Sequence, residues 1–313
     1  MQEYVVTKGG MRLDAFLHEV ASCLPAGALH RYLRENKIKV NGKKLPLSAR
    51  LEKGDVVRLY LPPAVAHGPK YLAAKPYFTV VYEDDQVLIA NKPAGLVVQD
   101  ETGAQMDTLL NRARRYLYES GWLHGNENWL PQLCHRLDTG TSGLVILAKT
   151  PAALEQMTEL IRTRAVQKEY LCVTLGAPAA KRAELHAFLV KDAKHGIVRV
   201  KNTPGAGAKE IITRYETLCT SGKLALLRVQ LVTGRTHQIR AHLASIGCPI
   251  LGDSKYGVAS ENRAYRFKYQ ALCAYCLRFP VLPVPSACAG LTEKVLLAEE
   301  PWYARQIRQG ELF

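Results

Sequence analysis

Short apolar runs bounded by glycine, aspartate or lysine recur from residue 78 onward, and they constrain the fold of this 313-residue chain more than any other feature. Runs of this length between turn residues predict β-strands. Helical patterns are fewer, at Leu109–Leu117, Ala153–Arg164 and Thr236–Ile246, and they do not alternate strictly with the strands. We therefore predict an α+β fold with a mixed, largely antiparallel sheet. The predicted strands are Phe78–Tyr82, Val87–Ala90, Leu144–Ala148, Tyr170–Leu175, Leu185–Val190, Ile211–Tyr215, Leu224–Val232 and Gln270–Leu277.

The first sixty residues follow a different pattern. Leu13, Phe16, Leu17 and Val20 have helical spacing, and a second helical pattern runs from Leu29 to Leu33. Alternating apolar residues around Ile38–Val40 and Val57–Leu61 then predict strands. We predict a small helix-helix-strand domain over 1–61, a proline-rich linker over 62–76 and a larger domain over 77–313.

The charge balance points to a polyanionic partner. Lys and Arg number 42 against 28 Asp and Glu, a net charge of +14, and a field of this sign attracts RNA, DNA or anionic membrane surfaces. Basic residues of the small domain concentrate between Arg31 and Lys44. With no run of eighteen apolar residues and no signal-like start, we expect a cytoplasmic protein without a membrane span.

Eight cysteines are scattered singly through apolar stretches, as buried thiols in a reducing compartment are. Cys273 and Cys276 form a CxxC pair, but the sequence offers no second ligand pair at matching spacing. We interpret this pair as core packing, with a structural or redox role as the alternative, and we expect no metal site. No Walker-type phosphate loop and no HExxH motif occurs.

The densest group of reactive residues runs from Cys134 to Gly143 and contains Asp138 in a Gly/Thr-rich loop before an apolar strand. A carboxylate held this way suits a nucleophile or base. Two alternatives stay open from the residues alone. Asp138 could simply accept backbone hydrogen bonds in a turn, or Asp138-Thr139-Gly140-Thr141 could be half of an aspartic protease site, which requires a second such carboxylate.

A second group runs from Leu231 to His242, where an apolar strand turns at Gly234 toward a helix. Arg235 stands at the junction, and a guanidinium beside a helix N-terminus can hold a phosphate or a carboxylate. The alternative is a solvated turn that leaves His237 and His242 on a helix surface.

Taken together, the motifs between Phe78 and Phe279 resemble the RluA-type pseudouridine synthase family in order and spacing. The first sixty residues resemble the alpha-L RNA-binding motif of a small-subunit ribosomal protein. Val98-Gln99, Cys273 and Pro280-Val281 depart from the family pattern. The matching pieces are Val81–Asp85, Asn91–Leu96, His135–Gly143, Lys168–Tyr170, Thr233–Arg240 and Gly252–Gly257.

The resemblance implies that Asp138 is the catalytic carboxylate, that Tyr170 stacks on the uracil, and that Arg235 lies beside Asp138. It implies base flipping, with Arg136 inserted where the base was, and it requires neither cofactor nor metal. The expected substrate is structured RNA, with ribosomal RNA of the large subunit favoured; transfer RNA, or a non-catalytic role in ribosome assembly, is the alternative. We expect a monomer. Further RNA contacts are expected at His135, Thr139, Thr233, His237, Arg240, Arg31, Arg34, Lys37, Lys39, Lys43 and Lys44.

Overall fold

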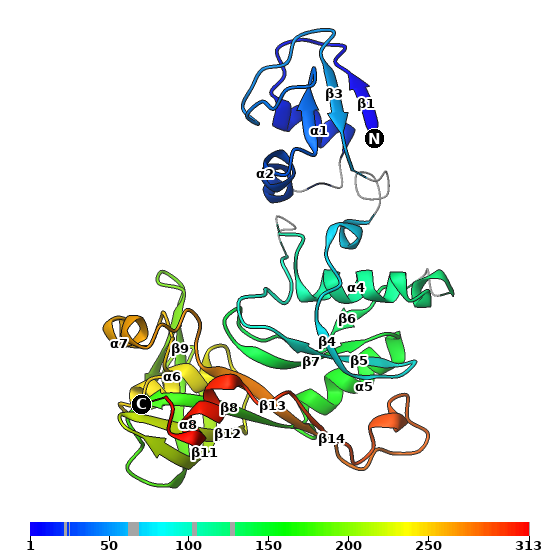
Figure 1. Ribbon diagram of the computed structural model, residues 1–313. Helices are drawn as coiled ribbons and strands as arrows, with labels where there is room; N and C mark the ends of the chain where they lie inside the picture. The colour runs from blue at the N-terminus through cyan, green and yellow to red at the C-terminus, as the bar shows by residue number, and fades with distance from the viewer. Residues whose placement is uncertain (22–23, 25, 62–68, 102–104, 126–128, 313) are drawn as a thin grey trace. The chain divides into compact units, whose positions relative to one another are not determined.

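The computed structural model describes residues 1–21, 24, 26–61, 69–101, 105–125 and 129–312, which form two compact units (Figure 1). One unit contains Met1–Tyr77 and Val97–Leu130, and the other contains Phe78–Leu96 and Pro131–Phe313. The segment 97–130 thus groups with the N-terminal residues, and the domain boundaries expected at 61 and 77 stay a prediction. The predicted linker lies outside the described residues over 62–68.

The first unit opens with strand β1 (Gln2–Val5), helices α1 (Leu13–Val20) and α2 (Ala26–Arg34), and strands β2 (Ile38–Val40) and β3 (Val56–Leu59). The strands pair antiparallel in the order β1-β3-β2. Leu13, Phe16 and Leu17 of α1 are buried, as their helical spacing predicts. The two predicted helices and the strands after them are confirmed, whereas β1 was not predicted. The unit also contains η1 (Lys70–Ala73), α4 (Leu109–Glu119) and η2 (Trp122–Gly125).

Within the described residues of the second unit, eleven strands form one sheet, which confirms the mixed, largely antiparallel fold. Its main path runs β10-β9-β11-β12-β8-β13-β7-β5-β4, with β14 beside β13 and β6 beside β7. Strands β13 and β7 pair in parallel. The strands are β4 (Thr79–Glu83), β5 (Val87–Lys92), β6 (Gln132–Leu133), β7 (Ser142–Ala148), β8 (Gln167–Leu175), β9 (Arg182–Asp192), β10 (Ile197–Lys201), β11 (Lys209–Ser221), β12 (Leu224–Leu231), β13 (Leu272–Arg278) and β14 (Val295–Leu297).

Helices cover this sheet and complete its core. Helix α5 (Pro151–Arg162) packs on β7, α6 (Gln238–Ser245) on β9 to β11, and α8 (Trp302–Gln309) on β8, β11 and β12. Two shorter helices are α7 (Ala259–Ala264) and η3 (Ala289–Leu291). The sequence did not predict α7, α8, β6, β10 or β14. Among the helices of the described residues, none is long and apolar enough to cross a membrane.

Where β7 meets β13, glycine is required at position 143. Gly143 has φ +108°, and a Cβ there would lie 2.2 Å from the Ala274 carbonyl oxygen. Both the backbone conformation and the close approach of β13 exclude a side chain.

We therefore expect Gly143→Ala to lower the free energy of unfolding by at least about 2 kcal/mol, because neither strand backbone can give way. Urea titration of both proteins measures it. Gly205→Ala is the matched control: among the described atoms none lies within 4 Å of its added Cβ, and its φ is outside the left-handed region. Equal midpoints for the two variants would contradict this account.

Candidate active site

Asp138 lies in a tight loop between β6 and β7 that is braced from several sides. The Thr141 amide donates to the Asp138 carbonyl oxygen at 3.0 Å, closing the turn. Gln270 Nε2 donates to Thr141 Oγ1 at 3.0 Å. Gly140 leaves room for this glutamine, since a Cβ at 140 would stand 2.1 Å from Gln270 Oε1. The loop therefore holds the Asp138 carboxylate in one position.

The charge partner of Asp138 is Arg240 in the first turn of α6. Its Nη1 donates to Asp138 Oδ2 at 2.7 Å. The other two nitrogens of the guanidinium, Nε and Nη2, donate to Asp253 Oδ2 and Oδ1 at 2.7 and 2.8 Å. One buried guanidinium thus joins two carboxylates from different loops, with a bidentate pair on Asp253 that fixes its plane.

The electrostatics of this triad follow from burial. Arg240 is 5% exposed and the Asp253 side chain 0%. Burial alone would lower the pKa of Arg240, but the hydrogen bonds and charges of Asp253 and Asp138 raise it above its ordinary value. Burial would likewise raise the pKa of Asp253, and Arg240 lowers it instead. The cation therefore stays charged at every accessible pH.

Asp138 itself is more open, with its side chain 27% exposed. The basic side chains within 4.0 Å of it, among the described residues, are Arg240 and His237, and both face Oδ2. No hydrogen-bond partner of Oδ1 occurs in the described part of the chain. The carboxylate is thus anchored through one oxygen, and the other is available for chemistry.

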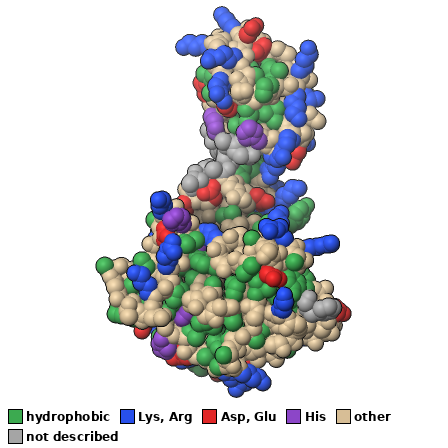
Figure 2. Space-filling model, turned by 90° about the vertical axis from the view of Figure 1, so that its left-hand side faces the viewer, with side chains coloured by type: hydrophobic (Ala, Val, Ile, Leu, Met, Phe, Trp, Pro, Cys, Tyr) green, Lys and Arg blue, Asp and Glu red, His purple; other side chains and the backbone are tan. Residues whose placement is uncertain are grey.

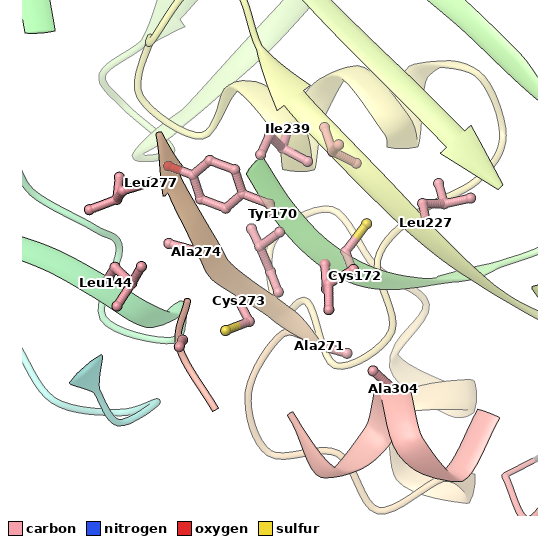
Figure 3. Packing of buried hydrophobic residues seen from close by; sticks show 14 of the residues in the cluster. Leu144, Tyr170, Cys172, Leu227, Ile239, Ala271, Cys273, Ala274, Leu277 and Ala304 are labelled. Atoms are coloured by element: carbon pink, nitrogen blue, oxygen red, sulfur yellow. The ribbon is translucent and has the colours of Figure 1, made fainter. Parts of the chain in front are cut away.

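Tyr170 is the aromatic neighbour of this carboxylate. It lies on β8 within the main core cluster, beside Ala274 of β13 (Figure 3). Burial, and after it the charge of Asp138, raises the pKa of Tyr170, so the phenol stays neutral. Tyr170 is thus close enough to feel the charge of Asp138, although the two are thirty-two residues apart, and its contact with a uracil stays a prediction.

Beneath the loop lies a buried lysine. Lys92, at the end of β5, is 0% exposed, and its Nζ donates to the carbonyl oxygens of Pro93, Leu96 and Thr139 at 3.0, 2.9 and 3.0 Å. All three ammonium protons are used on backbone. Desolvation lowers the pKa of Lys92 to about 7, although the negative charge of Asp138 acts to raise it.

The predicted ion pair between Arg235 and Asp138 is wrong, and Arg240 takes that position. Helix α6 begins at Gln238 rather than at Thr236. Arg235 therefore sits in the preceding loop, where it is exposed, while Arg240 points inward from the helix. Gln238 fixes that loop, because its Oε1 accepts hydrogen bonds from the Arg235 amide and Thr233 Oγ1.

Other predicted RNA contacts fall in different surroundings. Thr233 is 3% exposed and bonded to Gln238, so an RNA contact there is wrong, and Arg240 is buried in the triad. His135 Nε2 accepts from the Ile146 amide at 3.2 Å. Arg136 and Thr139 are exposed in the Asp138 loop. The six predicted basic residues from Arg31 to Lys44 lie in the first unit and are exposed or partly exposed. On the face of the molecule that Figure 2 shows, Lys and Arg side chains are scattered over the surface. Those contacts stay predictions.

Sequence reasoning assigned no role to Lys92, Asp253 or Tyr256, although all three stand in the quoted motifs. A lysine ending an apolar strand was the available signal for Lys92. Cys273 and Cys276 are buried free thiols on β13, and burial raises the pKa of Cys273 to about 11. Within the described residues, no group of three or more His, Cys, Asp or Glu is arranged to hold a metal ion.

A family profile, two related sequences and a solved structure that this chain resembles all belong to RNA pseudouridine synthases. The sequence profile of the RNA pseudouridylate synthase family matches residues 86–245. An uncharacterized RNA pseudouridine synthase of Chlorobaculum parvum is 34% identical over 86% of each chain. Ribosomal large subunit pseudouridine synthase C of Escherichia coli is 31% identical over 82% of this chain and 79% of its own. The solved human RNA pseudouridylate synthase domain containing 4 is 26% identical with a TM-score of 0.58, covering 74% of this chain and 92% of its own.

The lysine beneath the loop yields a pH-dependent prediction for stability. Its pKa is about 7 in the folded protein and 10.5 ordinarily. At a pH between these two pKa values, Lys92 carries a proton in the unfolded chain but not in the folded chain. The free energy of unfolding of the native protein therefore increases as the pH rises through this range. Lys92→Met cannot titrate and leaves carbonyls unpaired. We expect it to be less stable by roughly 2 kcal/mol or more.

The stability gap between native protein and Lys92→Met should widen from pH 6 to pH 9, measured by urea unfolding at each pH. Other titrating groups are common to both proteins and cancel in the difference. A gap that narrows or stays constant would mean that Lys92 keeps its proton across this range.

Proposed function

The chain belongs to the RluA-type RNA pseudouridine synthase family and is an isomerase acting on RNA uridines; we propose that it modifies ribosomal RNA of the large subunit, with Asp138 as its catalytic carboxylate. The observation that carries the proposal is the anchored carboxylate: Oδ2 of Asp138 is bound by Arg240, and Oδ1 is open. The ribosomal substrate is supported by similarity to ribosomal large subunit pseudouridine synthases such as that of Escherichia coli.

The reaction breaks the bond between uracil N1 and the ribose and joins the ribose to carbon 5. A carboxylate can take part as nucleophile or as base only when it is ionised. Enclosure with a stacked base removes water from Asp138 and favours its neutral acid. The Arg240 guanidinium opposes that tendency, because it stays charged and bonds to Asp138 directly. Tyr170 would supply a neutral aromatic ring for the uracil, a role supported by the raised pKa of its phenol, to which the charge of Asp138 contributes.

Reaching Asp138 requires that the target nucleotide leave the RNA helix. Extrusion costs roughly a few kcal/mol, which contacts in the pocket repay. Arg136 is exposed in the same loop, two residues from Asp138, and we propose that it occupies the space of the extruded base. Basic residues of the first unit, Arg31 to Lys44, would add phosphate contacts and hence salt-dependent affinity.

The direct test is Asp138→Asn, which keeps the side-chain volume and removes the ionisable group. We expect loss of pseudouridine formation by about 1,000-fold or more at saturating RNA, with RNA affinity retained. The substrate is unmodified large-subunit ribosomal RNA, and chemical labelling of pseudouridine reports turnover. Asp85→Asn, an exposed carboxylate on the same unit, is the matched control and should keep the native rate. Substantial single-turnover activity in Asp138→Asn would remove the catalytic assignment.

A second test compares the two arginines. Arg240→Lys keeps a charge but cannot bind Asp138 and Asp253 together with a fork, so its maximal single-turnover rate should fall about tenfold or more. Arg235→Ala removes only an exposed side chain, and its rate at saturating RNA should stay near the native value. Thermal unfolding checks that both variants are folded at the assay temperature. A normal rate in Arg240→Lys with a slow Arg235→Ala would reverse the assignment.

A further inference from the structure

His237 occupies a strained position next to the catalytic carboxylate. Its backbone has φ +54°, in the left-handed region that residues other than glycine uncommonly adopt, with asparagine, aspartate and histidine the most frequent among them. It precedes α6 directly, yet its side chain makes no capping hydrogen bond to that helix. Such conformations persist where surrounding structure enforces them, and they gather at functional sites. The imidazole faces Asp138, with Nε2 3.8 Å from Oδ2, and not the helix end.

The other side of the ring is held by Tyr256. The Val198 amide donates to the Tyr256 hydroxyl oxygen at 2.8 Å, and that oxygen lies 3.0 Å from His237 Nδ1. The described residues provide no other acceptor for the hydroxyl proton. Because the Val198 amide already donates to that oxygen, the arrangement that uses the hydroxyl proton inside the site has the hydroxyl donate to Nδ1, which makes Nδ1 an acceptor and puts the imidazole proton on Nε2. The Tyr256 ring also packs edge-on against the imidazole, at 5.6 Å between centroids.

His237 Nε2 faces Asp138 Oδ2 at 3.8 Å, the same oxygen that Arg240 binds. This separation exceeds a hydrogen bond by about 1 Å. Catalytic hydrogen bonds commonly tighten to normal length when the substrate binds. Burial lowers the pKa of His237. The charge of Asp138 opposes this shift, and the charge of Arg240 adds to it. The ring is therefore a neutral donor and not a second cation.

We propose that His237 is a positioning residue, which donates its Nε2 proton to Oδ2 of Asp138 and so directs Oδ1 toward the uridine. The inference rests on Asp138 being the catalytic carboxylate. It replaces the RNA contact expected from sequence with a role inside the site. Tyr256 acts one step further out, by holding the histidine in the tautomer that has a proton on Nε2.

Two substitutions separate the ring nitrogens. In His237→Gln the amide NH2 reaches the place of Nε2, whereas in His237→Asn it reaches only the place of Nδ1. Asparagine adopts the left-handed backbone conformation more readily than glutamine does. Backbone strain should therefore disturb His237→Asn less than His237→Gln, although His237→Asn is the variant that we expect to be slower. At saturating RNA, His237→Asn should lower the maximal single-turnover rate about tenfold, and His237→Gln should stay within about threefold of native, with similar RNA affinity for both.

The outcomes decide between roles. If both variants keep the native maximal rate and only bind RNA more weakly, His237 is an RNA contact and the positioning role is wrong. Equal slowing of Gln and Asn variants also overturns it, because the Nε2 donor would then not matter.

A second readout does not depend on activity. Nitrogen-15 NMR of labelled histidine at neutral pH should show His237 neutral with its proton on Nε2, and Tyr256→Phe should shift the population toward the Nδ1 tautomer. An Nδ1-protonated or charged ring in the native protein would overturn the inference. This result stands apart from the Asp138→Asn experiment, which alone tests the catalytic assignment.

Discussion

The guanidinium of Arg240 joins two carboxylates, and the arrangement of the site depends on that one group. Asp138 comes from the β6–β7 loop, Asp253 from the segment after α6, and Arg240 from α6 itself. Removing one partner from a buried ion pair leaves a charge without compensation, at a cost of about 3–5 kcal/mol. The ion pairs therefore fix the loop relative to the helix, and the position of the Asp138 carboxylate follows from them.

Two basic side chains hold this loop in different ways. Arg240 binds the carboxylate of Asp138, whereas Lys92 binds the carbonyl of the next residue, Thr139, from below. Desolvation moves the pKa of Lys92 close to neutrality, and the two carboxylates keep Arg240 charged. The positive field at Asp138 thus comes mainly from the group that also fixes its orientation. Preorganised charge of this kind needs no rearrangement when the reaction occurs.

Sequence periodicity predicted most of the sheet, because buried strands and amphipathic helices leave regular apolar patterns. It missed β10, although Ile197, Val198 and Val200 contain a strand signal, and α8, where Tyr303, Ala304 and Ile307 face the core. The motif resemblance assigned both Asp138 and Tyr170 to one site. It failed for Arg235 because two arginines stand five residues apart, and which one points inward depends on where α6 begins. That boundary is set by tertiary contacts of Gln238.

The same contacts explain why the carboxylate is held asymmetrically. Gln238 donates to Ile212 and Thr213 of β11 and accepts from the Arg235 amide, which fixes the loop before α6. With that loop fixed, Arg240 and His237 both approach Asp138 from the side of Oδ2. An oxygen already engaged by donors is a weaker nucleophile and a weaker base, since its lone pairs are occupied. The start of one helix therefore decides which oxygen of Asp138 is bound by these side chains and which one is left for the catalytic role that we propose.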